Sequence, residues 1–527
     1  MWFEDVCSLV RSGYFSNKQS KGTLVESLKE LYSQCISFHV KTRGFTREDL
    51  KYVTQIMNKV PRLMYFSCKG ISVCPEKDCH ITEFCAGPDI SKSHNIPTKL
   101  KRLTLKSCKP SNLRNLHSNQ LRHFEVTCCD FEKGETQDLV QHLRMCTLLE
   151  SLHFSLNSIV DLSASDSLCK SVCSAISSKR LQHIDLSEMQ MQNEDAIALS
   201  NNTLRQLDLR TLKLNNNSIG NKGMVSVFGA LEHMSRLVHL NVSSNYFSKW
   251  YAQIAIANSL SKLTSLQNIA IGDTFARDRR IIGAIGLLTQ LSVLDVSGIH
   301  FAHSLKNSFT HSLKRLMLNR TNIKDLNFLK CAPNIEELCA DSNEINLKNS
   351  GALKEMSNLR TLSLCYNKIA SEDELVDMIC CLSGLENLRL KGNSFLKNKS
   401  IRFWSATRRL RTLDVGMCEI ESIHLSSTSL EELHMCGSYC VSGTFWENTH
   451  LPNLKVLNLE GAKLNVQLLC KFLKKCRLVV FKIYIEGLGT RQQEAIFKCL
   501  DKSRLQKISG QGLCRTTKSL DFVKVKY

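Results

Sequence analysis

The chain has 527 residues and a formal net charge of +20; 43% of its residues are hydrophobic, 22% are charged and only 7 are proline. This composition excludes a disordered or collagen-like chain. No apolar run of about eighteen residues occurs, and the first residues carry Glu4, Asp5 and Arg11 where a signal peptide needs an apolar core. We therefore expect a folded protein of the cytoplasm, with the nucleus as the alternative, and no membrane segment.

Cysteine is frequent, but the 24 cysteines are spread over the whole length rather than packed into a short scaffold. We interpret them as small buried thiols in a reducing compartment. Five glycosylation sequons would instead indicate a secreted protein. They occur at Asn201, Asn216, Asn241, Asn319 and Asn398. Such matches arise by chance in an Asn-rich repeat, so we do not expect secretion.

Residues 1–62 begin with two helical patterns, LVESLKELYSQC and TREDLKYVTQIMNKV, the second opened by Thr46 and Asp49. The segment ISFHV between them has the pattern of a strand. We predict an N-terminal cap with one or two degenerate repeats, because terminal repeats need a polar outer face. A small helical adaptor unit is the alternative for the same residues.

One template then recurs along the chain: apolar residues at positions 1, 4 and 6, an Asn, Cys or small residue at 9, and an apolar residue at 11. Leu63, Phe66 and Cys68 fit it as a first copy. Sixteen further copies begin at Leu100, Leu121, Leu149, Leu181, Leu209, Leu237, Leu266, Leu291, Leu313, Ile335, Leu359, Leu385, Leu410, Leu430, Leu454 and Leu478.

The stretch LRQLDLRTLKL contains the template in two overlapping frames, one from Leu204 and one from Leu209. The second frame keeps the spacing of its neighbours and continues with Asn217 at position 9. We therefore predict the strand at Leu212 to Leu214 and assign LRQLDL to the connection before it.

Apolar residues at positions 4 and 6 predict a short strand with one buried face. A buried Asn or Cys at position 9 can satisfy backbone groups in the turn between stacked repeats. Each unit cannot bury its apolar face alone, so the neighbours together form the core.

These residues resemble the leucine-rich repeat family, over roughly residues 63–509. The resemblance implies an α/β solenoid, or horseshoe, with a parallel sheet on the concave face and helices or 3₁₀ segments on the convex face. The longer repeats resemble those of ribonuclease inhibitor and the shorter ones those of cytosolic repeat proteins. Residues 510–527 are expected to form a C-terminal tail.

The long repeats have room for convex helices. Met224, Val227, Phe228 and Leu231 fall on one helical face. A second helix is indicated by Ser371 and Glu374, which fit a capping box before Leu375, Met378, Ile379 and Leu382. In the 22-residue copies, the segment NIKDLNFLKCAPNIEEL leaves space only for a tight turn or a short 3₁₀ segment.

We find no phosphate-binding loop, nucleophile elbow, metalloprotease helix or kinase signature, so the sequence predicts no enzyme, no catalytic residue and no cofactor. The nearest approach to a metal site is CKGISVCPEKDCHITEFC, with Cys68, Cys74, Cys79, His80 and Cys85. Its gaps are not the paired spacing typical of zinc, and Cys68 occupies a strand position, so we predict no metal.

Four histidines, His123, His153, His183 and His239, fall at outward positions of their strands and so on the concave side. A metal ladder would need matching positions on adjacent repeats. Since His153 is at position 5 and the others are at position 3, we interpret them as polar surface residues.

Positions 2, 3, 5, 7 and 8 of each copy should merge into one outward face of parallel strands. Arg and Tyr, which dominate many protein interfaces, are frequent there, whereas Glu and Asp interrupt the positive charge, so nucleic acid is not the expected partner. The predicted partner-binding residues are Arg315, Arg320, Glu336, Glu337, Arg360, Tyr366, Arg389, Lys391 and Arg411.

The C-terminal part is basic: residues 401–527 hold 20 Lys and Arg against 11 Asp and Glu. This charge is consistent with an acidic partner there. A solubilising surface is the alternative, because no stripe of basic residues interleaved with aromatics accompanies the charge.

These observations favour a non-catalytic scaffold or recognition subunit that binds a protein on the concave face. One alternative is the substrate receptor of a cullin-type ubiquitin ligase. Leu31 and Cys35 have the separation of an elongin-binding box, from which Glu30 and His39 depart. The other is the ligand-sensing region of an innate immune receptor, whose class also needs an ATP-binding module that the sequence does not contain.

Overall fold

The computed structural model describes residues 37–41, 65–69, 82–86, 99–107, 120–131, 133–159, 168–177, 179–204, 209–274, 279–300, 310–348, 351–396, 400–403, 409–418, 422–425, 427–437, 449–462, 464–483, 488–500 and 507–509. The chain divides into two compact units, residues 1–266 and residues 267–527. Each unit is described by itself.

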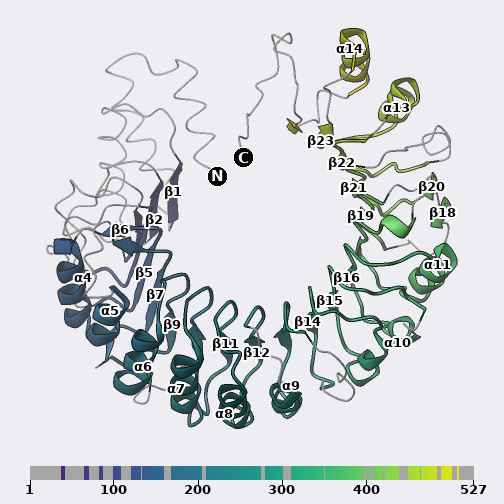
Figure 1. Ribbon diagram of the computed structural model, residues 1–527. Coiled ribbons are helices and arrows are strands. Elements are labelled where there is room, and N and C mark those ends of the chain that lie inside the picture. The colour runs from purple at the N-terminus through teal and green to yellow at the C-terminus, as the bar shows by residue number, and fades with distance from the viewer. Residues whose placement is uncertain are drawn as a thin grey trace, which may run out of the picture. The chain divides into compact units, whose positions relative to one another are not determined.

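The first unit is built on parallel strands, with one strand in each repeat (Figure 1). Neighbouring strands pair in strict register, so that Leu212 lies between Ile184 and Leu240. The strands are β1 (Ser37–Lys41), β2 (Tyr65–Lys69), β3 (Glu83–Ala86), β4 (Arg102–Lys106), β5 (His123–Thr127), β7 (Ser151–Ser155), β9 (His183–Asp185), β10 (Thr211–Lys213) and β11 (His239–Asn241).

A row of helices covers one side of these strands, each helix packed on the next (Figure 1). The helices are α4 (Lys133–Met145), α5 (Leu168–Ile176), α6 (Asn193–Asn202), α7 (Asn221–Leu231) and α8 (Trp250–Leu260). Two short strands, β6 (Asp130–Phe131) and β8 (Ser158–Ile159), form a separate parallel pair.

The second unit repeats the plan with shorter connections. Its strands are β12 (Asn268–Ala270), β13 (Val293–Asp295), β14 (Arg315–Met317), β15 (Glu337–Cys339), β16 (Thr361–Ser363), β17 (Asn387–Arg389), β19 (Thr412–Asp414), β21 (Glu432–His434), β22 (Val456–Leu459), β23 (Val480–Ile483) and β24 (Lys507–Ser509). A second parallel pair is formed by β18 (Ser400–Phe403) and β20 (Ser422–Leu425).

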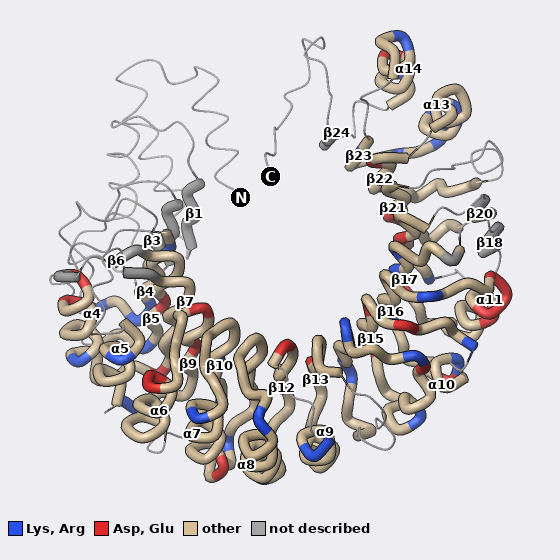
Figure 2. The backbone as a smooth tube through the Cα atoms, viewed as in Figure 1, with Lys and Arg blue, Asp and Glu red and all other residues tan. Residues whose placement is uncertain are grey.

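The connections of the second unit are helices of unequal length, because the repeats differ in length. They are α9 (Arg279–Gly286), the 3₁₀ segment η4 (Asn327–Cys331), α10 (Gly351–Lys354), α11 (Glu372–Cys381), the 3₁₀ segment η5 (Ser394–Leu396), α13 (Val466–Leu473) and α14 (Thr490–Cys499). Figure 2 shows the acidic first turn of α11, where carboxylates interact favourably with the positive end of the helix dipole.

The apolar positions 1, 4 and 6 form the core between strands and connections. In one repeat these are Leu209, Leu212 and Leu214, all fully buried. Burying such a side chain contributes roughly 1.5–3 kcal/mol, so the stack gains stability with every repeat added. Side chains at positions 2, 3, 5, 7 and 8 point to the other side, which we call the strand face.

In many repeats position 9 carries a buried asparagine that joins neighbouring repeats. The Asn217 amide oxygen accepts hydrogen bonds from the backbone of Met189 (2.9 Å) and Met191 (3.0 Å). Its amide nitrogen donates to the carbonyls of Leu186 and Leu214, both at 2.9 Å. Asn245, Asn343 and Asn393 make equivalent bonds to carbonyl oxygens. These bonds satisfy backbone groups that would otherwise be buried without partners.

Position 8 adopts the left-handed backbone conformation in repeat after repeat, as in Asn216 (φ 55°). This conformation directs its N–H to the next repeat, where it donates to the carbonyl oxygen of Ser243 at 3.0 Å. A left-handed residue other than glycine costs about 1–2 kcal/mol, which the hydrogen bond offsets. The further positions with this conformation are Ser107, Cys128, Leu156, Glu188, Ser244, Asp273, Gly298, Arg320, Ser342, Tyr366, Gly392, Met417, Gly437 and Gly461.

The predicted leucine-rich-repeat fold is confirmed. Every one of the sixteen template copies from Leu100 onward begins two residues before an observed strand, and the copy from Leu63 does the same. The second reading frame is the one used, since β10 is Thr211–Lys213 and Leu212 and Leu214 are buried. The strand expected at ISFHV is β1. The helices expected in residues 24–35 and 46–60 lie outside the described residues.

The predicted connections are also confirmed, with one difference. The helix through Met224 is α7, and the short segment after Ile323 is η4. Of the capping box expected at α11, the Ser371 hydroxyl accepts from the Glu374 N–H, but the buried Oε2 of Glu374 has no hydrogen-bond partner. The small pairs β6–β8 and β18–β20 were not expected. In the described part of the chain, no helix is both long and apolar enough to cross a bilayer.

The position 9 network predicts the effect of Asn217→Ala. The substitution leaves buried N–H and C=O groups of two repeats without partners, so unfolding free energy should fall by about 2 kcal/mol or more. Urea unfolding measures the loss, and amide hydrogen exchange at Met189 and Met191 should accelerate. Asn201→Ala, at an exposed position of α6, is the control and should change stability by less than about 0.5 kcal/mol. Equal effects of the two substitutions would contradict this role.

Candidate partner-binding face

The predicted partner-binding residues all lie on the strand face of the second unit. They come from β14, β15, β16, β17 and β19 or from the residues next to these strands, which pair in register one after another. The structure therefore brings this set together, as the periodicity predicted. Their individual surroundings differ, and the sequence did not show that difference.

Position 2 carries charges of alternating sign on seven successive repeats. Ion pairs join Lys314 to Glu336 at 3.3 Å, Arg360 to Glu386 at 3.6 Å and Lys455 to Glu431 at 2.7 Å. The hydrogen bond from Lys455 holds the pKa of Glu431 below its ordinary value. In order, the residues of this charge ladder are Lys314, Glu336, Arg360, Glu386, Arg411, Glu431 and Lys455.

Position 3 adds one more pair, in which Arg315 lies 3.2 Å from Glu337. Exposed ion pairs of this kind contribute only about 0–1 kcal/mol each. They nevertheless neutralise four of the predicted binding residues, Arg315, Glu336, Glu337 and Arg360, within the stack. The alternation is visible in the sequence only after the repeats are aligned on position 2.

Tyr366 and Met417 meet across an intervening repeat. Both are at position 8, and the Tyr366 hydroxyl donates to the Met417 sulfur at 3.8 Å. Between them Gly392 (φ +76°) leaves the space open, because a Cβ there would lie 2.4 Å from the Tyr366 ring. The two side chains stay 46% and 47% exposed. We call Tyr366, Gly392 and Met417 the apolar ridge.

One cation, Lys391, lies next to the apolar ridge. The ammonium of Lys391 lies 6.0 Å from the centre of the Tyr366 ring, within cation–π range. Partial burial lowers the pKa of Lys391, but Cys436, Tyr366 and Asp414 together outweigh it, so that pKa lies above its ordinary value. Among the described residues, neither Arg389 nor Arg411 forms an ion pair within 4.0 Å.

Arg320 lies in a similar arrangement elsewhere on the strand face. Its guanidinium pairs with Asp273 at 2.9 Å, two repeats away. The intervening Gly298 (φ +72°) allows this, since a Cβ there would collide with the Asp273 carboxylate. A cavity of about 400 Å³ is lined by Asp273, Gly298, His300, Arg320, Asn322 and Ser342. Its six lining residues include no large hydrophobic side chain, whereas small-molecule pockets are lined predominantly by hydrophobic and aromatic side chains.

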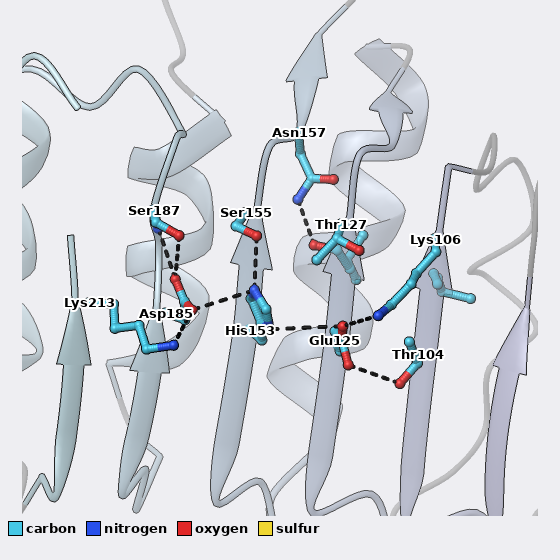
Figure 3. A network of polar contacts seen from close by, with 12 residues as sticks. Thr104, Lys106, Glu125, Thr127, His153, Ser155, Asn157, Asp185, Ser187 and Lys213 are labelled. Carbon is cyan, nitrogen blue, oxygen red and sulfur yellow. Dashed lines mark hydrogen bonds and ion pairs between the residues drawn. The ribbon is translucent and has the colours of Figure 1, made fainter. Parts of the chain in front are cut away.

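The strand face of the first unit carries a closed polar network that the sequence did not reveal (Figure 3). Glu125 pairs with Lys106 at 2.9 Å and accepts from Thr104 at 3.2 Å. Asp185 pairs with Lys213 at 3.3 Å. These charges therefore satisfy one another across β4 to β10.

His153 lies between the two carboxylates of this network. Its Nε2 is 3.4 Å from Asp185, and its Nδ1 is 3.9 Å from Glu125 (Figure 3). Nε2 is also 2.9 Å from the Ser155 hydroxyl. The expected outward position of His153 is confirmed, and its partners make it part of the network.

The position 3 histidines, His123, His183 and His239, are half-buried on the same face. Burial lowers the pKa of each, assisted by the neighbouring Arg102, Arg210 and Lys213 respectively. In the described part of the chain, no three His, Cys, Asp or Glu side chains are grouped as metal ligands. Cys85 is buried in β3, while Cys74, Cys79 and His80 lie outside the described residues. Leu31 and Cys35 also lie outside them.

Parallel strands, buried leucines at positions 1, 4 and 6, a left-handed residue at 8 and a buried polar side chain at 9 together define a leucine-rich-repeat protein. No family model matches the sequence. The Rho GTPase-activating protein gacW of Dictyostelium discoideum is 24% identical in an alignment of 319 residues that covers 52% of this chain and 26% of that protein. The chain thus spans about a quarter of the length of that curated relative.

Two solved structures are also similar. The TLR13–ssRNA13 complex is 16% identical, with a TM-score of 0.48, over 86% of this chain and 76% of that chain. The mouse RP105/MD-1 complex is 14% identical, with a TM-score of 0.47, over 90% of this chain and 89% of that chain. The class of this protein therefore rests on its own repeat geometry.

The apolar ridge predicts that Gly392→Ala is destabilising. The new methyl group would occupy the space of the Tyr366 ring in a left-handed conformation, so we expect a loss of about 1–2 kcal/mol or more. Gly283→Ala in α9 is the matched control, because a Cβ there meets open space. That substitution should raise stability by up to about 1 kcal/mol. Urea unfolding of both variants measures the difference, and a neutral Gly392→Ala would remove the steric argument.

The half-buried histidines predict a pH dependence of stability. Because their pKa values are lowered in the folded state, the unfolded chain takes up protons first, and this stabilisation is lost as pH falls through the ordinary histidine value. The triple variant His123→Gln, His183→Gln, His239→Gln should lose less stability than the parent between about pH 8 and about pH 5.5, around the ordinary histidine pKa. Unfolding with urea at each pH is the measurement. His233→Gln, at an exposed position, should follow the parent.

Proposed function

We propose that this chain is a non-catalytic recognition scaffold that binds a protein partner on the strand face of its second unit. The observation that carries the proposal is the apolar ridge with Lys391 beside it, on the same strand face as the exposed Arg389 and Arg411. Tyrosine and arginine are the residue types that most often dominate binding energy at protein interfaces. An exposed apolar centre with a charged border is the usual anatomy of such an interface.

The ridge is held in place before any partner arrives. Tyr366 and Met417 each donate a backbone N–H to the next repeat, to Lys391 at 2.6 Å and to Cys436 at 2.8 Å. A surface that is already ordered loses little conformational entropy on binding, so more of the contact energy appears as affinity.

The rest of the strand face is less suited to binding a partner than the apolar ridge. Its charges are paired along the position 2 ladder and, in the first unit, within the network of Figure 3. Breaking such pairs to contact a partner would return little net energy. Glu336, Glu386 and Glu431 also interrupt any positive track, which argues against a nucleic-acid backbone as ligand.

The thiols on this face support a binding role rather than catalysis. Burial raises the pKa of Cys339 and Cys365 to about 11, so both remain protonated and weakly nucleophilic near neutral pH. Cys418 acts as a structural donor, since its thiol bonds to the Leu390 carbonyl at 3.0 Å. A disulfide would remove that bond, which agrees with the reducing compartment that we propose, the cytoplasm or the nucleus.

The acidic partner considered for residues 401–527 fits the same site. Arg411 belongs both to that basic region and to the charge ladder on the strand face. We therefore place the binding of an acidic protein surface at this end of the charge ladder rather than at a separate site.

The double variant Tyr366→Ser, Arg389→Glu tests the proposal in cells. Fused to a biotin ligase, the full chain should label a partner that the variant labels at least about tenfold less, since one hot-spot residue is worth about 2 kcal/mol. Both side chains are exposed, so the melting temperature should not change. Quantitative mass spectrometry of the labelled proteins is the measurement.

The control variant is Leu287→Ser, Lys330→Glu, which removes one exposed apolar side chain and reverses one exposed cation away from the strand face. It should label the same proteins as the parent. If the strand-face variant keeps every partner, or if only the control loses them, the proposed site is wrong.

A further inference from the structure

A second exposed surface lies in the first unit, at the start of α8, away from the strand face. The segment YFSKWY, Tyr246 to Tyr251, connects a buried Asn245 to this helix. Tyr246, Trp250 and Tyr251 are 61%, 71% and 45% exposed. In the described part of the chain, Trp250 is the most exposed of the large apolar side chains. Three exposed aromatic residues within six positions need an explanation, because single exposed apolar residues are ordinary but clusters mark interaction sites.

The backbone of this segment is fixed at both ends. The N–H of Tyr246 donates to the Ile219 carbonyl at 2.8 Å, and the N–H of Lys249 donates to the Asn221 side chain at 2.8 Å. Since Ile219 and Asn221 are two residues apart, Tyr246 and Lys249 are attached side by side to the preceding repeat.

Two buried side chains hold the middle of the segment in place. Phe247 is fully buried, and the buried Gln253 amide donates to the Ser248 carbonyl at 2.7 Å. The rings of Trp250 and Tyr251 pack edge to face, with centroids 6.3 Å apart. The aromatic side chains are therefore presented by an ordered backbone, which lowers the entropy cost of binding.

Two lysines give this surface its charge. Lys249 is the N-cap of α8, and Lys222 is the second residue of α7, next to Asn221. Both are exposed, and neither has an ion pair within 4.0 Å among the described residues. The positive charge does not continue along the helix row, because Glu194 holds in α6 the place that Lys222 holds in α7.

We propose that Tyr246, Lys249, Trp250 and Tyr251, with Lys222, form a docking surface for an acidic segment of a partner protein, with an apolar side chain of that segment packed on Trp250. Tyrosine and tryptophan offer large rigid contact areas with a hydrogen-bond donor at the edge. The two unpaired ammonium groups complement carboxylates beside the apolar anchor.

Two lysines are too few to bind an anionic membrane surface or a nucleic acid. Binding to an anionic membrane surface uses clusters of about four to eight basic residues, and single-stranded nucleic acid needs a positive groove that follows its backbone. With Glu194 next in the row, neither condition is met. A short acidic peptide segment needs only one or two cations next to its apolar contact.

A library of phage-displayed random 12-residue peptides, selected on the full chain, tests the proposal. We expect selected peptides rich in Asp and Glu around one large apolar residue. Their affinity, measured by fluorescence polarisation, should fall at least about tenfold for Trp250→Ser and for the double variant Lys222→Glu, Lys249→Glu, and should weaken with added salt. Acidic residues are favoured near helix N-termini, so the double variant should fold normally.

The matched control is again Leu287→Ser, Lys330→Glu, which should keep full affinity. The strand-face variant Tyr366→Ser, Arg389→Glu should keep it too, so the outcome does not depend on the function proposed above. Selection of basic or uncharged peptides, of peptides insensitive to Trp250→Ser, or of none would overturn the proposal. So would Trp250-dependent binding of a poly-U oligonucleotide or of phosphatidylserine vesicles.

Discussion

The interaction on which the turns of most repeats depend is the buried polar side chain at position 9, although Met189, Ile299 and Ala462 occupy that position in three repeats. After the strand, the backbone must reverse inside the stack, where no water can satisfy its N–H and C=O groups. Asn217 and its equivalents supply both donors and acceptors there, and they do so for two repeats at once. Once the turn is fixed, position 8 can take its left-handed conformation and donate to the next repeat. These bonds help to fix the register of the strands and the direction of the side chains on the strand face.

The same bonds explain why the two proposed surfaces are rigid. Tyr366 is held in the left-handed conformation between Cys365 and the position 9 residue Asn367, whose amide bonds to Ala340 and Cys365. The aromatic segment of the first unit follows Asn245, whose amide bonds to Leu214 and Val242. The proposed recognition residues thus lie next to hydrogen-bonded turns rather than on long free loops. The buried side chains at position 9 therefore stabilise the fold and also hold the neighbouring exposed side chains in place.

The sequence predicted the fold because a period of leucines is a property of the chain itself. Leu209 and Leu237 are 28 residues apart in sequence and one repeat apart in space, so alignment of the copies gives the register directly. The site was predicted only in outline. Whether Arg360 faces solvent alone or pairs with Glu386 depends on side-chain geometry across repeats of unequal length. Likewise Gly392 reads as a permissive turn residue, and only the coordinates show Tyr366 and Met417 meeting above it. Trp250 does not belong to the repeated pattern of the sequence. The exposure of its side chain depends on the surrounding structure, which the sequence alone does not show.

The alternating charges at position 2 constrain how this array can change in length. From Lys314 to Lys455 each residue of the ladder has neighbours of opposite sign. Deleting or duplicating a single internal repeat would set two like charges side by side, whereas removing or adding a pair of repeats would preserve the alternation. The charge ladder therefore favours changes in which repeats of this part of the solenoid are gained or lost in pairs.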